Sequence, residues 1–481
     1  MPVSLDSTLS WKSATGDDEA MLESLQPNIL KGHTREFLTL LFLKFQNAGD
    51  AASLLSELAT DGIVPPLMKS AIRHLEEVAA FNSKGVKGTP YVGVGLTADG
   101  YRALGIPEHG WPSDPSVRRG MTNNETVATL GDPDVDGWEG HFLQKMDAVI
   151  LVGDQLAETR DIAERRVRDM IASRPSIVIL GEQTGNGLHN RNGDGIEHFG
   201  YVDGRSQPIF LDEDLVSEKL REDGTTNWDA GFGLGRVLVS DAAAPDPQTQ
   251  FGSYFVFRKL EQDVRKFKTQ EAAFATSLGL AGDTAERAGA MLVGRFEDGT
   301  PLTIQSADGA HSPVQNDFTY DSDPEGGKCP FFAHIRKMNP RGSGGFETVE
   351  RERLHIMARR GQTYGVRTDD PNDGKLNNKP THGVGLLFMA FNSSLVDQFE
   401  FVQKNWANNA GFPSTPSGRA AGLDLVIGHG KRPDVECPLG WGADSSGATH
   451  HRTVDAVPQA VTMMGGEYFF MPSLAFLQAL A

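Results

Sequence analysis

Phe37-Leu-Thr-Leu-Leu-Phe-Leu-Lys-Phe45 is an apolar run interrupted only by one threonine and one lysine. A short run this rich in aliphatic and aromatic side chains predicts a strand that is buried on both faces. A helix is expected to follow at residues 50–60. The same order, a strand and then a helix, recurs near residues 148, 253 and 384, and the helix after residue 253 is expected at residues 261–275. Each half of the chain therefore carries two strong strand–helix units.

Two halves of the same design indicate a duplicated α+β fold. Each domain is expected to be an antiparallel sheet with helices packed on one face. A doubly wound parallel sheet is disfavoured, because no Gly-rich phosphate loop joins a strand to a helix. Further short strands are expected at residues 91–96, 176–180, 425–427 and 467–471.

The Pro- and Asp-rich stretch at residues 241–250 is the natural boundary between the halves. We therefore expect a polar N-terminal tail at residues 1–27, a first domain at 28–240 and a second domain at 241–481. Of the motifs described below, the glycine–aspartate motif falls in the first domain and the histidine motif in the second.

The chain has 481 residues and a formal net charge of −19. This excess of negative charge disfavours binding to nucleic acid and to anionic membranes, and an anionic substrate would need a local basic pocket. No apolar run is long enough to span a membrane, and the polar start at residues 1–18 lacks the features of a secretion signal. We therefore expect a cytoplasmic protein, or a secreted one if a signal has been removed. Cys329 and Cys437 form neither a disulfide framework nor a Cys-x-x-Cys metal motif.

The sequence Lys328-Cys-Pro-Phe-Phe-Ala-His-Ile-Arg-Lys-Met-Asn-Pro-Arg341 places a single histidine, His334, between an apolar run and a basic one. This arrangement suits the axial ligand of a haem, because the apolar wall packs on the macrocycle and cations such as Arg336 can meet its propionates. A histidine beside aromatic residues is more commonly a hydrogen-bonded structural residue. The motif alone leaves both interpretations open.

Two further motifs contain residues suited to a site. Asp203, in Gly200-Tyr-Val-Asp-Gly204, can be held at a tight bend where the backbone comes close to a flat ligand, although an aspartate before a glycine commonly makes only an Asx-turn. Arg359 begins the sequence Arg359-Arg-Gly-Gln-Thr-Tyr-Gly365. Pointing into a buried site, it would stabilise negative charge that develops on oxygen. The alternative is a solvated basic turn.

In this order, and in a chain of this length, the three motifs resemble those of the dye-decolorizing peroxidases, most closely the larger branch of that family. The resemblance extends over almost the whole chain. The supporting segments are Asn28-Ile-Leu-Lys-Gly-His33, Gly95-Leu-Thr97, Val256-Phe-Arg-Lys-Leu-Glu-Gln-Asp263, Gln398-Phe-Glu-Phe401 and Gly465-Gly-Glu-Tyr-Phe-Phe470.

The resemblance implies two ferredoxin-like domains and one haem b (iron protoporphyrin IX) per chain, held mainly by the second domain. By the same resemblance, His334 is the proximal iron ligand, and Asp203 and Arg359 are catalytic residues on the distal side. Which of these two dominates is left open. Leu386 and Phe388 fall on the apolar distal wall of the haem site.

Two smaller assignments rest on the same resemblance. Gly204, next to the distal aspartate, is expected to contact the haem. Asp424 matches the carboxylate that hydrogen-bonds the proximal imidazole and so assists catalysis. Leu425 stands where the family pattern has proline, so Glu400 is kept as an alternative partner for the imidazole.

The implied reaction uses hydrogen peroxide to oxidise bulky aromatic donors, dyes and phenols among them, by one-electron steps through compound I. Tyr364 and Trp406 match positions where the larger branch can place oxidisable surface aromatics, and simple packing is an equally weighted alternative for both rings. The alternative function is a haem-binding or haem-handling protein with incidental peroxidase activity. The natural donor and the oligomeric state are left open.

Overall fold

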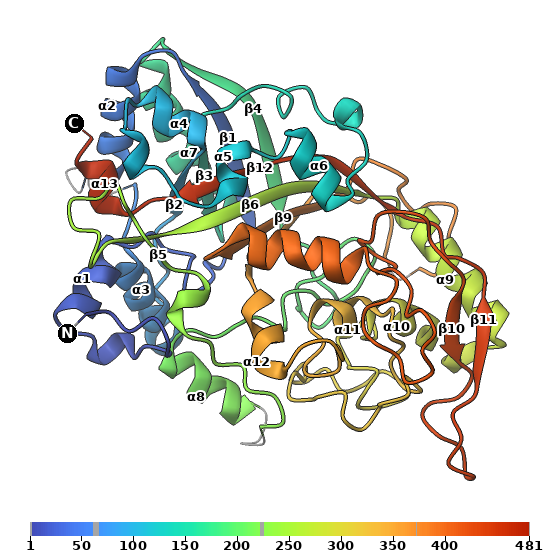
Figure 1. Ribbon diagram of the computed structural model, residues 1–481. Coiled ribbons are helices and arrows are strands. Elements are labelled where there is room, and N and C mark those ends of the chain that lie inside the picture. The colour runs from blue at the N-terminus through green and yellow to red at the C-terminus, as the bar shows by residue number, and fades with distance from the viewer. Residues whose placement is uncertain (1, 61–66, 222–225, 372, 481) are drawn as a thin grey trace.

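The computed structural model describes residues 2–60, 67–221, 226–371 and 373–480 (Figure 1). Its strands are β1 (Phe37–Phe45), β2 (Tyr91–Leu96), β3 (Ala148–Asp154), β4 (Ile177–Asn186), β5 (Val239–Ser240), β6 (Phe251–Gln262), β7 (Ala358–Arg359), β8 (Gln362–Tyr364), β9 (Gly385–Asn392), β10 (Val435–Pro438), β11 (His451–Val454) and β12 (Val461–Met471). Its α-helices are α1 (Asp17–Ser24), α2 (Ala48–Ala59), α3 (Ala71–Lys84), α4 (Ala98–Ala103), α5 (Pro115–Arg119), α6 (Asn124–Leu130), α7 (Ala157–Ala172), α8 (Asp212–Arg221), α9 (Val264–Leu278), α10 (Glu286–Val293), α11 (His334–Met338), α12 (Val349–Glu352) and α13 (Leu474–Gln478). Two π-helical segments, η7 (Leu395–Glu400) and η8 (Val402–Ala407), follow β9.

One antiparallel sheet of ten strands carries both halves of the chain. Its main path runs β4-β1-β3-β2-β12-β6-β9-β7, with β5 paired to β6 and β8 paired to β9. The first four strands of this path and the last four have the same arrangement relative to chain order, which is that of a ferredoxin-like domain. The protein is therefore a pair of ferredoxin-like domains whose sheets join where β2 meets β12, at Leu96 and Phe470.

The helices cover the sheet in the way expected for a duplicated α+β fold. Helix α7 packs on β1, β3 and β4, and α2 packs on β1. Helices α9, α10 and α11 belong to the second half of the chain, and α10 contacts the other two (Figure 1). The expected division at residues 241–250 falls between β5 and β6. The exact limits of the domains stay a prediction. In the described part of the chain, no helix is both long enough and apolar enough to span a bilayer.

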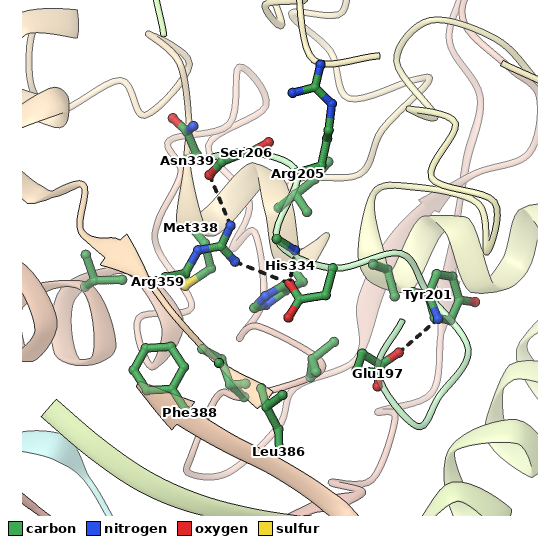
Figure 2. A pocket seen from close by; sticks show the side chains of 18 of the residues that line it. Glu197, Tyr201, Arg205, Ser206, His334, Met338, Asn339, Arg359, Leu386 and Phe388 are labelled. Carbon is green, nitrogen blue, oxygen red and sulfur yellow. Dashed lines mark hydrogen bonds and ion pairs between the residues drawn. The ribbon is translucent and has the colours of Figure 1, made fainter. Parts of the chain in front are cut away.

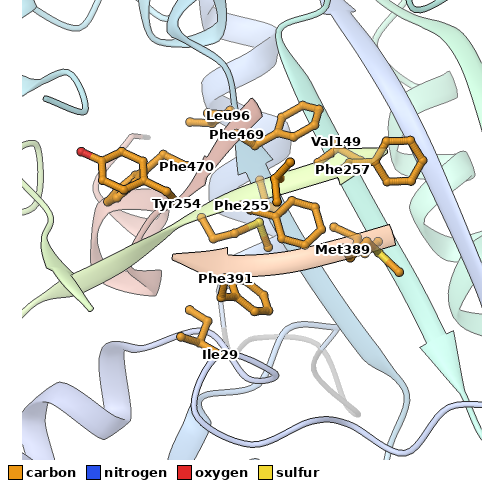
Figure 3. Close-up of a cluster of buried hydrophobic side chains, with 14 of the residues drawn as sticks. Ile29, Leu96, Val149, Tyr254, Phe255, Phe257, Met389, Phe391, Phe469 and Phe470 are labelled. Carbon is orange, nitrogen blue, oxygen red and sulfur yellow. The ribbon is translucent and has the colours of Figure 1, made fainter. Parts of the chain in front are cut away.

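Aromatic side chains fill the core across the junction of the two sheets (Figure 3). The ring of Phe42 on β1 lies 5.3 Å from that of Phe257 on β6, and Phe255 lies 5.2 Å from Phe391 on β9. All four side chains are fully buried. Burying a side chain of this size stabilises the fold by about 1.5–3 kcal/mol, so this cluster ties the two domains together.

Two expected elements differ from the structure. The helix expected from residue 261 begins at Val264, because β6 continues to Gln262 and the Asp263 side chain accepts the N–H of Lys266 at 2.9 Å. Residues 425–427 form a turn and no strand. The reason is local, since the Asp424 carboxylate accepts the N–H groups of Val426 and Ile427, the last two residues of this turn.

A buried acid on β12 makes the stability of the fold depend on pH. Glu467 Oε1 accepts the N–H groups of Met121 and Tyr468, both at 2.8 Å. Burial raises the pKa of Glu467 from 4.5 to about 7. Between these two values the folded protein keeps a proton that the unfolded chain has lost, so the free energy of unfolding falls as the pH rises.

We predict that Glu467→Gln removes this loss, because a neutral amide oxygen can accept the same two hydrogen bonds. Relative to wild type, the variant should gain up to about 3 kcal/mol in free energy of unfolding between about pH 4.5 and pH 7. Chemical denaturation at the two ends of this range measures the difference. Parallel loss of stability in both proteins would show that Glu467 does not carry the effect.

Candidate active site

A cavity of about 230 Å³ is lined by residues of both domains. Its apolar lining includes Leu386 and Phe388, which alternate along β9 and so point to the same side of the sheet (Figure 2). Its polar lining includes His334, Asp203 and Arg359. The structure therefore brings Asp203 together with His334 and Arg359, which lie more than 100 positions later in the sequence.

His334 is the first residue of α11 and is held by a buried carboxylate. Its Nδ1 lies 2.7 Å from Oδ2 of Asp424, which is fully buried. Among the described residues, none is hydrogen-bonded to Nε2 of His334. The ring nitrogen that a metal would need is therefore available, while the other nitrogen is fixed in place.

The two partners shift each other's pKa in opposite directions. Burial alone would lower the pKa of His334, but the Asp424 carboxylate raises it above its ordinary value. Burial alone would raise the pKa of Asp424, but His334 and the N–H groups of Ile427 and Val426 hold it below its ordinary value. The carboxylate consequently stays ionised and makes the imidazole a better electron donor.

The structure places Asp424, and not Glu400, against His334. Glu400 Oε1 instead accepts the hydroxyl of Tyr468 at 3.1 Å. The leucine that replaces the expected proline at position 425 leaves Asp424 in contact with the imidazole.

Asp203 and Arg359 form a pair that also lines the cavity. Nη1 of Arg359 lies 3.7 Å from Oδ1 of Asp203, and its Nη2 donates to the carbonyl of Ser206 at 3.1 Å (Figure 2). The Arg359 backbone is fixed by its place in β7 and by a hydrogen bond from its N–H to Gln207 Oε1 at 3.0 Å. Both side chains remain partly exposed, so they can meet a small molecule that enters the cavity.

The aspartate sits on a bend that requires glycine. Gly204 has φ +76°, in the left-handed region, and its N–H donates to Asp203 Oδ1 at 2.6 Å. This contact is to the next residue and not to the one after it, so it differs from the Asx-turn that the sequence suggested. Gly204 itself lines the cavity beside the aspartate.

Glu197 was not singled out from the sequence. It lines the cavity and accepts the N–H groups of Phe199 at 2.8 Å and Tyr201 at 3.0 Å, which fixes the bend before Asp203 (Figure 2). Burial raises its pKa to about 7. The available signal was an acid three residues before Gly200, in a position to accept the N–H groups of the loop.

Arg336, the cation expected beside a cofactor, does not line the cavity. Arg336 is fully buried, forms an ion pair with Asp323 at 2.9 Å and does not line the cavity, so its assignment to cofactor binding is wrong. Besides Arg359, the arginines that line the cavity are Arg205, Arg258, Arg295 and Arg341.

The two rings expected at the surface are buried. Trp406 is 1% exposed and stacks on Phe412 with ring centroids 5.2 Å apart, and Tyr364 is 7% exposed. The prediction that Trp406 and Tyr364 lie at the surface is therefore wrong. The helix that carries Trp406 turns its aromatic face toward the protein interior.

The residues that line the cavity fit a haem. An apolar wall can pack on a macrocycle, the unpartnered Nε2 of His334 can bind iron, and arginines of the lining can meet acidic substituents. On the other side, the Asp203–Arg359 pair provides a carboxylate and a guanidinium for a polar reactant.

Comparison with known proteins gives relatives that span the chain. No family model matches. The chain is 57% identical to the multifunctional dye peroxidase DyP2 of Amycolatopsis sp. over the full length of both proteins, and 30% identical to the dye-decolorizing peroxidase msp1 of Mycetinis scorodonius over 80% of this chain and 75% of that protein. The solved structure of DyP2 superposes with a TM-score of 0.94 at 56% identity, covering 99% of this chain and 100% of that one. A DyP-type peroxidase from Anabaena sp. gives a TM-score of 0.87 at 33% identity, covering 98% and 97%.

We predict that Gly204→Ala destabilises the loop that carries Asp203, because a side chain is strained at positive φ even where space is free. The free energy of unfolding should fall by about 1–2 kcal/mol. Chemical denaturation measures this loss. Gly195→Ala is the matched control, since Gly195 lies in the same region without positive φ and its added Cβ would meet nothing within 4 Å. Equal stability of the two variants would contradict the prediction.

Proposed function

The chain belongs to the dye-decolorizing peroxidase family, and on this premise we propose that it binds one haem b in the 230 Å³ cavity and uses hydrogen peroxide to oxidise bulky aromatic donors, dyes and phenols among them. The observation that carries the proposal is the placement of His334 with Asp424, and of Asp203 with Arg359, around one cavity. The alternative of a haem-handling protein is not favoured, since the relatives that cover the whole chain are named as peroxidases.

His334 would hold the cofactor through Nε2. Asp424 keeps the Nδ1 proton of His334 in a hydrogen bond of 2.7 Å, which orients the ring and makes Nε2 more basic. When bound, haem b supplies the redox chemistry, which is the two-electron reduction of peroxide and the one-electron oxidation of donors. Leu386 and Phe388 exclude water from the apolar side of the cavity.

Asp203 would move the proton on the distal side. Its Oδ1 is already engaged by the N–H of Gly204 and by Arg359, which would leave Oδ2 to take a proton from one oxygen of hydrogen peroxide and return it to the other. Arg359 would stabilise the negative charge that develops on the leaving oxygen. Since the two side chains form one pair, loss of either removes the ionic partner of the other.

We predict that His334→Ala abolishes stable haem retention, because the other two histidines of the lining are held by other partners: His355 by Asp397 and Glu347, and His429 by Gln459 and Asp132. The absorption spectrum of the purified variant should lack the haem band of wild type. His382→Ala, at an exposed histidine, serves as the control. Full haem content together with near-normal turnover in the His334 variant would overturn the assignment.

We also predict that Arg359→Leu slows the reaction with hydrogen peroxide by at least about 100-fold, the usual cost of losing one preorganised donor. Asp203→Asn should slow the same step, and the ratio of the two effects tells which residue dominates. Stopped-flow mixing with peroxide measures both rates. Arg419→Leu, at an exposed arginine paired with Glu436, is the control. Wild-type rates in both distal variants would remove these residues from peroxide cleavage.

A further inference from the structure

A second cavity, of about 440 Å³, lies behind the Asp203–Arg359 pair. It shares a wall with the first cavity, made of Asp203, Gly204, Arg359, Gly361 and Leu386. The outer cavity, as we call it, is otherwise lined by residues of the ranges 30–36, 187–196, 207–214 and 360–363. Its lining includes the exposed residues Gly187, His189 and Gly195, so it reaches the protein surface.

Two arginines of the outer cavity have no acidic partner. Arg35 and Arg360 are each 9% exposed and donate only to backbone carbonyls and to the Asn28 side chain. Among the described residues, no carboxylate forms an ion pair with either guanidinium. By contrast, Lys31 pairs with Asp214 at 2.5 Å and Arg359 with Asp203 at 3.7 Å. Two buried positive charges are thus uncompensated in the wall of this cavity.

The pKa of Arg360 reflects the same crowding of positive charge. Burial, together with the nearby charges of Arg35 and Arg359, lowers it to about 9. With a pKa of about 9, Arg360 remains cationic near neutral pH. A negative charge placed in the outer cavity would relieve the mutual repulsion of the three arginines.

The remaining lining contains the acids Glu36 and Asp214, and it also contains apolar side chains that can hold an aromatic ring. Leu30, Leu188, Ile196, Ile209 and Phe210 all contribute to the wall. An apolar cavity with a few charged groups at fixed positions is the usual form of a site for a small organic ligand. Because the whole chain carries a net charge of −19, an anionic ligand needs a local excess of positive charge of this kind.

We propose that the outer cavity is a binding site for small anionic aromatic donors, such as phenols that carry a carboxylate. The ring packs on the aliphatic wall, and Arg35 and Arg360 attract the carboxylate. The proposal rests on the proposed peroxidase function, because the bound phenol would be the electron donor. Two phenols each lose one electron and one proton to become phenoxyl radicals, and the two electrons and two protons convert one hydrogen peroxide into two waters.

The test compares 4-hydroxyphenylacetate with its neutral amide. Calorimetric titration of the holoenzyme, without peroxide, measures the affinity for each compound. The acid should bind at least about tenfold more tightly than the amide, which corresponds to one charge–charge interaction at partial screening. An unchanged haem absorption band shows that the compounds do not bind to the iron.

Variants at Gly195 locate the binding site, because its φ is not positive and an added Cβ would meet nothing within 4 Å. Gly195→Asp should weaken binding of the acid about tenfold relative to Gly195→Asn, a neutral side chain of the same shape, and should leave the amide unaffected. Gly195→Phe should block both compounds. Gly140→Phe is the control, at a glycine with equally open space outside this cavity.

Equal affinity for the acid and the amide in wild type would overturn the proposal, and so would equal binding of the acid by the Asp and Asn variants. These results are independent of the proposed function, since no peroxide is present. Failure of the peroxidase function itself would appear separately, as absence of peroxide-dependent turnover with the neutral amide as donor.

Discussion

A single buried carboxylate, that of Asp424, determines how the candidate active site is built. It is fully buried and receives three donors: Nδ1–H of His334 and the N–H groups of Val426 and Ile427. An isolated ionised carboxylate at such a position would cost several kcal/mol. The folded chain therefore has to bring the loop at 424–427 to the start of α11, and the orientation of the imidazole follows from that contact.

Continuous burial made the central strands predictable from the sequence. The limits of β1 and β2 agree with those expected, because both strands are buried along almost their whole length and so appear as uninterrupted apolar runs. The turn at 425–427 was mistaken for a strand for the opposite reason. Its apolar residues follow an aspartate whose side chain competes for their backbone N–H groups, and a window of hydrophobicity does not register that competition.

The motifs predicted the residue types of the site, but they did not predict in which direction every side chain points. His334, Asp203 and Arg359 meet at one cavity as expected. Arg336 does not, because two residues along a helix point to different sides, so a cation at that spacing from His334 turns away from the cavity. The arginines that replace it, Arg205 and Arg295 among them, come from other parts of the chain. Only the tertiary packing of the chain brings these arginines to the cavity.

Arg359 lines both cavities and so belongs to the wall between them. Whatever binds in the outer cavity changes the electrostatic environment of the same cation that a reactant meets in the inner one. The two cavities are thus thermodynamically linked. Any factor by which an occupant of one alters the affinity of the other must act equally in the reverse direction. With both cavities occupied, the shared wall of Asp203, Gly204, Arg359, Gly361 and Leu386 would couple the two sites heterotropically, and this coupling would require no movement of the backbone.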